Sequence, residues 1–246
     1  MFAASSPRIE ARFWVALCFA SICGINLGDL LPDAFHLAAA PALAILIGVF
    51  AALALTQALI GRRAEVLFWL ALLMVRAAAT VLADFSISEA HLGFPAVSAA
   101  LAILFLAGVA ASRGFAGAEG LVFPGASPLS WLTLAIAATL GTVTADWAGH
   151  AMGSPKIGVP VAAMGESLLV GAALVARLRA GRPTWSYWLA TLAIFTWGTS
   201  VGDIVKFLLS MPVCLGGSFV LLGLTILAWR PGGNPSAPRP GGRERD

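Results

Sequence analysis

Four aspartates recur at one fixed spacing from tryptophan, and they are the residues in this sequence best placed to do chemistry. Each aspartate follows a tryptophan by fifteen positions. The four pairs are Trp14 and Asp29, Trp69 and Asp84, Trp131 and Asp146, and Trp188 and Asp203. All four aspartates lie in strongly apolar stretches, and an acid within a membrane span marks a functional site by default. The recurrence therefore predicts a site for a small cation or for protons.

The residues just before each aspartate also repeat. Small residues occupy positions −5 and −1, a pattern that lets helix backbones approach closely. Position −4 is Thr80, Thr142 or Thr199 in three copies and Ile25 in the first. On a helix this position lies one turn from the aspartate on the same face. Either the hydroxyls help the carboxylates bind an ion, or they bond to their own helix carbonyls while each aspartate caps the outer turn.

Three histidines lie close behind the aspartates. His36 and His91 follow theirs by seven positions, and His150 follows Asp146 by four. Oxygen ligands alone suit hard cations such as Mg²⁺, Mn²⁺, Ca²⁺ or Na⁺, whereas added imidazole suits Mn²⁺ or Zn²⁺. The histidines are therefore candidate metal ligands, and the commoner alternative is three solvated loop residues. We expect no resident cofactor, only a transported ion.

The composition says which elements must position these residues. Of 246 residues, 59% are hydrophobic and 11% are charged, and the mean hydropathy is +0.91. Soluble domains have about 45–50% apolar and about 25% charged residues, so the chain is expected to be an all-α integral membrane protein. The apolar runs lie near 11–31, 37–60, 64–85, 92–112, 128–148, 157–178, 184–206 and 212–230. Each is long enough to span a bilayer as a helix.

The basic residues predict the orientation of these helices. Twelve of the fifteen lysines and arginines lie at the N-terminus, at the C-terminus or in the loops that follow each second helix. The opposite loops hold only Lys156 and Lys206. By the positive-inside rule both termini are cytoplasmic. An Ala-, Arg- and Gly-rich, Lys-poor composition suggests a bacterial source, and hence the inner membrane. Since the basic residues set topology, they give no reason to expect nucleic-acid binding.

Each repeat is expected to comprise two helices, which return the chain to its starting side. Such repeats share one orientation and are related by a pseudo-four-fold axis along the membrane normal. The second helices are expected to open on a further match at Leu37, Leu92, Ile157 and Leu215. The repeats cover residues 11–62, 64–113, 128–182 and 184–230 of a single membrane domain, with the longest loop at 113–127 and a disordered cytoplasmic tail at 231–246. The first helix of each repeat is predicted to be central.

The tryptophan spacing predicts the depth of the aspartates. Fifteen helical residues rise about 22 Å. If each tryptophan anchors at the cytoplasmic headgroups, its aspartate lies in the outer third of a hydrocarbon core about 30 Å thick.

Two further charges fall in the middle of predicted spans. Arg76 belongs to the third helix and Glu166 to the sixth. An unpaired charge near the bilayer midplane is costly. Arg76 is therefore predicted to pair with Glu166 or with one of the aspartates.

The four Gly-x-x-x-[Gly/Ala]-Asp helices, with their Leu-Gly-x-Pro-like restarts, resemble a family of bacterial membrane-anchored proteins whose activity is uncharacterised. The likeness covers nearly all of residues 11–230. It implies an eight-helix inner-membrane protein and supplies no activity. The second repeat departs from the pattern, because Ala79 and Ala83 replace both glycines.

Three function hypotheses follow. The first is a transporter or exporter of a small cation, either a divalent metal such as manganese or protons, in which the four aspartates and three threonines bind the ion. The second is a non-transporting scaffold or partner subunit, in which the Gly/Asp motifs only pack helices. The third, a membrane enzyme with an aspartate as general base, ranks last because no enzyme signature such as GxSxG, HExxH or a P-loop occurs. The expected partners are the bilayer and the cation, and a homo-oligomer is left open.

Overall fold

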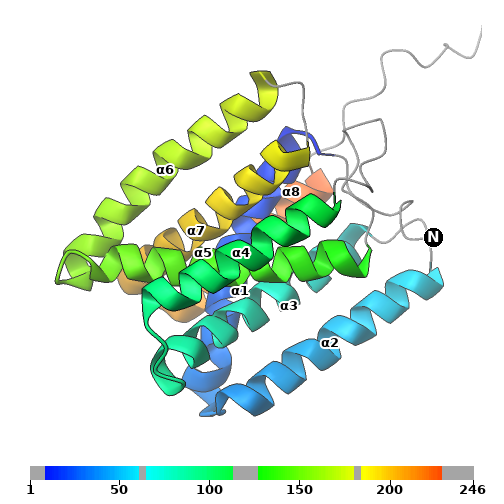
Figure 1. Ribbon diagram of the computed structural model, residues 1–246. Helices are drawn as coiled ribbons and strands as arrows, with labels where there is room; N and C mark the ends of the chain where they lie inside the picture. The colour runs from blue at the N-terminus through cyan, green and yellow to red at the C-terminus, as the bar shows by residue number, and fades with distance from the viewer. Residues whose placement is uncertain (1–8, 61–64, 113–126, 180–183, 229–246) are drawn as a thin grey trace, which may run out of the picture.

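Eight helices make up the part of the chain that the computed structural model describes, namely residues 9–60, 65–112, 127–179 and 184–228 (Figure 1). They are α1 (Ala11–Phe35), α2 (Ala39–Ile60), α3 (Glu65–Asp84), α4 (Phe94–Ser112), α5 (Pro128–His150), α6 (Pro155–Arg179), α7 (Thr184–Leu209) and α8 (Met211–Ala228). A π-helical turn, Phe85–Glu89, extends α3. All eight are long and apolar enough to cross a membrane, which confirms the prediction of eight such helices.

Some sequence predictions fall outside the described residues. The tail at 231–246 and nearly all of the 113–127 loop are among them. So are most of the arginines that predict the orientation, including Arg62 and Arg63. The cytoplasmic placement of both termini therefore stays a prediction.

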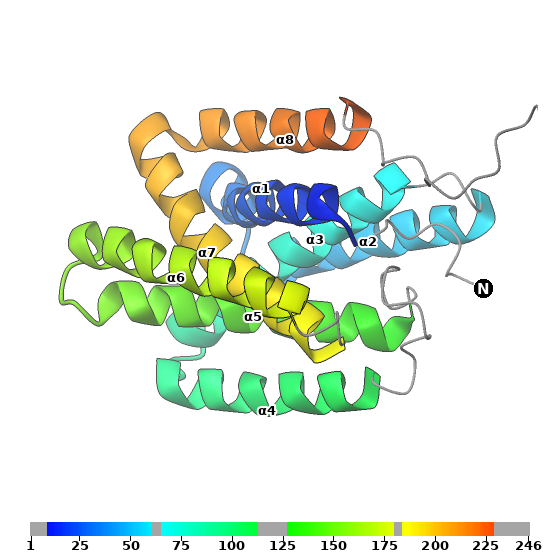
Figure 2. The ribbon, with the colours of Figure 1, turned by 90° about the horizontal axis from the view of Figure 1, so that it is seen from above.

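The first helix of each predicted repeat belongs to an inner ring. In this ring α1 packs on α3, α3 on α5, α5 on α7, and α7 returns to α1 (Figure 2). The inner helices bury many alanine, glycine, serine and threonine side chains, whereas α2, α4, α6 and α8 expose most of their apolar residues. Small side chains allow this close packing, and the exposed apolar surface of the outer helices suits contact with lipid.

Each outer helix packs chiefly on the inner helix that follows it in the chain. The chain places α2 on α3, α4 on α5 and α6 on α7, and α8 closes the ring by packing on α1. The two helices of the first, second and fourth predicted repeats therefore contact each other much less than they contact their neighbours, whereas α5 and α6 of the third also pack directly, with Gly149 against Gly158. The contact between α8 and α1 joins the last described helix to the first.

Glycines at the predicted small-xxx-small positions bring the inner helices into close contact. A Cβ atom at Gly24 would lie 2.5 Å from Cβ of Arg76, and one at Gly28 would lie 2.8 Å from Cβ of Thr80. Likewise, a Cβ atom at Gly198 would lie 2.5 Å from Cβ of Ser21. These separations are too short for any side chain, so the glycines fix how closely α1 meets α3 and α7 meets α1.

The corner after each inner helix uses the same backbone conformation. The residue seven positions after each motif aspartate has a positive φ: His36 52°, His91 53°, Gly153 76° and Ser210 79°. The left-handed conformation ends a helix and redirects the chain. The outer helices begin one to three residues later.

The predicted helix openings differ from the observed helix starts by two to four residues. Ile157 and Leu215 lie inside α6 and α8, which begin at Pro155 and Met211. Proline is favoured in the first turn of a helix, where its missing N–H removes no hydrogen bond. Pro155 and Pro212 therefore mark these starts better than the hydrophobic match did.

The tryptophans that define the spacing lie in the protein core more than at its surface. Trp69 is 2% exposed and Trp188 is fully buried. The Trp188 indole donates a 3.1 Å hydrogen bond to Ser112 Oγ, and Phe13 packs 5.5 Å from Trp69 between ring centres. For these two residues neighbouring helices supply both the apolar contacts and the polar partner that an indole needs, and their predicted depth at the headgroups stays a prediction.

Candidate functional site

Arg76 lies at the centre of the inner ring and is fully buried. Its guanidinium donates hydrogen bonds to side chains on all four inner helices. The acceptors are Ser21 Oγ (3.3 Å), Thr80 Oγ1 (3.4 Å), Thr142 Oγ1 (2.7 Å), Thr199 Oγ1 (2.6 Å) and the Phe195 carbonyl (3.2 Å). The planar guanidinium can serve several acceptors at once, which suits it to a position where four helices meet.

The three motif threonines are engaged twice. Thr80, Thr142 and Thr199 each donate to the carbonyl four residues earlier, at 3.1–3.2 Å, and each accepts from Arg76. Of the two predicted alternatives, ion binding or bonding to their own helix carbonyls, the structure shows the second for these hydroxyls. Each hydroxyl oxygen accepts a hydrogen bond from Arg76. In this arrangement the threonines therefore bind the arginine and not an ion.

The four motif aspartates share one electrostatic environment above this network. Asp29, Asp84, Asp146 and Asp203 all interact electrostatically with Arg76 and with one another. They lie at or within two turns of the ends of their helices, away from the tryptophans. The fixed spacing thus gathers one carboxylate from each inner helix at one end of the ring.

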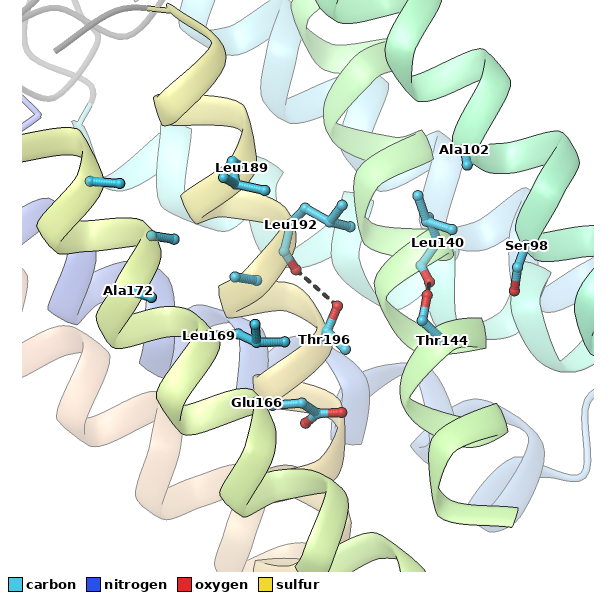
Figure 3. A pocket seen from close by; sticks show the side chains of 13 residues that line it. Ser98, Ala102, Leu140, Thr144, Glu166, Leu169, Ala172, Leu189, Leu192 and Thr196 are labelled. Carbon is cyan, nitrogen blue, oxygen red and sulfur yellow. Dashed lines mark hydrogen bonds between the residues drawn. The ribbon is translucent and has the colours of Figure 1, made fainter. Parts of the chain in front are cut away.

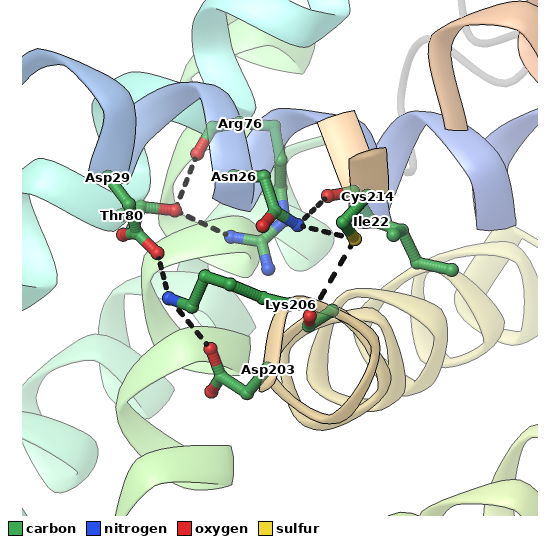
Figure 4. Close-up of polar contacts among 9 residues, drawn as sticks. Ile22, Asn26, Asp29, Arg76, Thr80, Asp203, Lys206 and Cys214 are labelled. Carbon is green, nitrogen blue, oxygen red and sulfur yellow. Dashed lines mark hydrogen bonds and ion pairs between the residues drawn. The ribbon is translucent and has the colours of Figure 1, made fainter. Parts of the chain in front are cut away.

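Lys206 supplies a positive charge among these carboxylates that the sequence interpretation missed. Its Nζ lies 2.5 Å from Asp29 Oδ2 and 3.3 Å from Asp203 Oδ1 (Figure 4). The ammonium therefore bridges α7 and α1. The sequence interpretation assigned Lys206 to an outer loop. A signal was available, since residues three apart on a helix are neighbours and α7 continues beyond Asp203.

Asp84 and Asp146 differ from the bridged pair. Within the described residues, neither carboxylate makes a hydrogen bond or an ion pair. Asp84 is exposed and Asp146 is half-buried. Two of the four acids are therefore open to a ligand arriving at this end of the ring.

The predicted pair between Arg76 and Glu166 is not formed. Arg76 bonds hydroxyls and a carbonyl within the ring, while both Glu166 carboxylate oxygens are buried without a hydrogen-bond partner. Glu166 belongs to outer helix α6 and lines a separate cavity. This alternative was wrong because it treated midplane depth as proximity, whereas Arg76 lies inside the inner ring and Glu166 lies on an outer helix. For the other alternative, Arg76 interacts electrostatically with all four motif aspartates but forms no direct ion pair with them among the described residues.

The histidines lie at the same end of the molecule as the aspartates but are exposed. His36 and His91 occupy left-handed corner positions, and His150 Nδ1 lies 2.7 Å from the Asp146 carbonyl oxygen. Over the described ranges, no three His, Cys, Asp or Glu side chains are close enough together to hold a metal ion. The structure therefore does not bring the histidines into a ligand set with the aspartates.

These features define a multi-pass helical membrane protein with a charged cluster at one end of its inner ring. Comparisons with protein-family models, with curated proteins and with solved structures find no match to the chain. The resemblance to a bacterial membrane-anchored family therefore stays a prediction.

Proposed function

We propose that this protein is a transporter or exporter of a small cation, either a divalent metal such as manganese or protons. The observation that carries the proposal is the Lys206 ammonium, which binds two of the four clustered aspartates. The Lys206 ammonium lies 2.5–3.3 Å from two carboxylate oxygens, and we propose that a mobile cation binds in the same place.

The net negative charge of the aspartate cluster suits a cation as the transported ion. The four motif aspartates face two fixed cations, Arg76 and Lys206, and Asp33 adds a fifth carboxylate that interacts electrostatically with Asp29 and Asp84. The fully ionised group therefore carries three net negative charges. One divalent ion or two protons would neutralise most of that charge. Carboxylate oxygens are the ligands that hard divalent cations prefer.

A bound ion and Lys206 compete in this proposal. Asp84 and Asp146 offer the first contact because they are exposed or half-buried and are without a described partner. Further ligation by Asp29 and Asp203 requires Lys206 to leave them. The half-buried Lys206 side chain has four flexible carbons, so it can move away at a small cost in free energy. Competition of this kind keeps the affinity low enough for the ion to be released again.

The experiment is ion flux in proteoliposomes. Purified protein is tested with imposed gradients of Mn²⁺, Mg²⁺, Zn²⁺, Ca²⁺, Na⁺ and H⁺. The proposal expects saturable flux of at least one ion, which disappears when all four motif aspartates are changed to asparagine. Flux that survives the quadruple change in a folded protein contradicts it.

A scaffold or partner subunit is the second candidate function, and the glycine contacts favour it. Gly24, Gly28 and Gly198 act in helix packing, and the Arg76 network ties all four inner helices together. On this proposal no ion moves under any gradient, and the aspartate changes lower stability alone. In both cases we propose a bacterial inner-membrane protein with both termini in the cytoplasm.

A further inference from the structure

A cavity lies between the outer helices α4 and α6, away from the aspartate cluster. Its volume is about 570 Å³, within the range of small-molecule sites, which is roughly 300–1,000 Å³. Helices α5 and α7 also contribute to its wall (Figure 3). Nine of its thirteen lining residues are alanine or leucine, so an occupant must be mainly apolar.

Glu166 is the acid in this apolar wall. Its side chain extends from α6 toward α7 and the cavity (Figure 3), is 6% exposed, and has no hydrogen-bond partner for either carboxylate oxygen. The Ser200 hydroxyl on α7 is near but completes no hydrogen bond with it. Buried polar groups are normally paired, so an unpaired acid aimed into a cavity points to a missing partner.

The other polar groups of the cavity do not supply that partner. The hydroxyls of Thr144 and Thr196 donate to carbonyls of their own helices. Ser98 Oγ, on the α4 side, is itself buried and unpartnered. A ligand that satisfies Glu166 must therefore bring its own hydrogen-bond donor, and one with a positive charge also balances the carboxylate.

The depth of Glu166 identifies the source of the ligand. Glu166 is the twelfth of 25 residues in α6, so it lies near the middle of a membrane-spanning helix. A ligand reaching this depth between two outer helices comes from the lipid phase. We propose that the cavity binds a lipid-soluble amine, with its apolar body among the alanines and leucines and its ammonium on Glu166. The site is independent of the proposed cation transport.

The test compares three probes with one tail and different headgroups: dodecylamine, dodecanol and dodecanoate. Binding to the full chain in detergent is measured by native mass spectrometry. Dodecylamine is expected to bind saturably, with one molecule per chain, about tenfold more tightly than dodecanol, and dodecanoate more weakly still. Equal affinity for the amine and the alcohol would overturn the proposal.

Two variants test whether the amine binds in this cavity and on Glu166. Glu166→Gln keeps the shape and loses no hydrogen bond of the protein, so it is expected to fold and to bind the amine and the alcohol equally. Ala172→Phe fills the cavity and is expected to abolish both. Val175→Phe, on the same helix but outside the cavity, is the control and should change neither. Amine preference that survives Glu166→Gln, or binding that survives Ala172→Phe, places the site elsewhere and contradicts the proposal.

Discussion

Nζ of Lys206 lies 2.5 Å from Oδ2 of Asp29, joining residues 177 positions apart and the last inner helix to the first. The same ammonium lies 3.3 Å from Asp203 on its own helix. This contact places a protein cation among carboxylates that are proposed to take a mobile one. The bridge therefore has two consequences that can be separated by experiment: it closes the inner ring, and it competes with the ion.

Replacing Lys206 by methionine should tighten divalent-ion binding while lowering stability without the ion. The change frees Asp29 and Asp203 as ligands and leaves the cluster one charge more negative. We expect the dissociation constant for the transported metal to fall by about tenfold, the equivalent of about 1.4 kcal/mol. Isothermal titration calorimetry on detergent-solubilised protein measures it. Lys156→Met, at an exposed lysine in the first turn of α6, is the control. Weaker binding by the Lys206 variant would count against the competition.

Replacing Arg76 by methionine should be strongly destabilising. The change removes five described hydrogen bonds from a fully buried side chain and leaves the aspartates without their central counter-charge. Removing one partner of a buried charge network costs about 3–5 kcal/mol. Thermal unfolding in detergent should show a large drop in Tm, against little change for the exposed Arg179→Met. Equal Tm values for the two variants would show that the network is not structural.

Two glycine substitutions separate close packing from simple helix propensity. Gly198→Ala places a methyl group against Ser21 at the contact between α7 and α1, whereas Gly165→Ala points into open space. Overpacking costs about 1–3 kcal/mol, while an alanine in an open helical position gains about 0.5–1 kcal/mol. We expect Tm to fall for the first variant and to stay level or rise for the second. The reverse order would mean that the ring tolerates looser packing than the structure shows.

Accessibility of single cysteines tests the proposed orientation. In a background without Cys18, Cys23 and Cys214, a cysteine replacing His36 or Ser210 should react with a membrane-impermeant maleimide in intact cells. A cysteine replacing Arg179 should react only after the membrane is opened. Both expectations follow from the positive-inside rule. Labelling in the opposite order would place the aspartate cluster on the cytoplasmic side.

Hydrophobic run lengths predicted the eight helices to within four residues at each end, since hydrocarbon thickness constrains span length strongly. The spacing of the aspartates also predicted that they share one depth. Neither pattern could show that α2 packs on α3 or that α8 packs on α1. Those contacts depend on how helices distant in sequence pack together.

The partners of Arg76 and Lys206 show where prediction from sequence ended. An arginine in an apolar span needs polar partners, but the sequence does not say which ones. Glu166 is the acid predicted to lie at the same depth, whereas the structure pairs Arg76 with hydroxyls on three other helices. Lys206 was recoverable from its i+3 relation to Asp203, yet its bond to Asp29 requires the ring to close. Local spacing therefore predicted that the motif aspartates lie close together. Which of these charged residues contact one another depends on how the helices pack.

The most direct test of cation transport is flux through a variant with Asp84→Asn and Asp146→Asn. This change leaves the bridge of Lys206 with Asp29 and Asp203 intact, so the inner ring should still close. With Glu89→Gln, an exposed acid at the same end of the molecule, as the control, metal and proton uptake are measured in proteoliposomes. The account predicts that the double variant keeps its Tm and loses at least about 90% of the flux, while the control retains it. Full flux in the folded double variant would contradict the assignment of these carboxylates as the cation site.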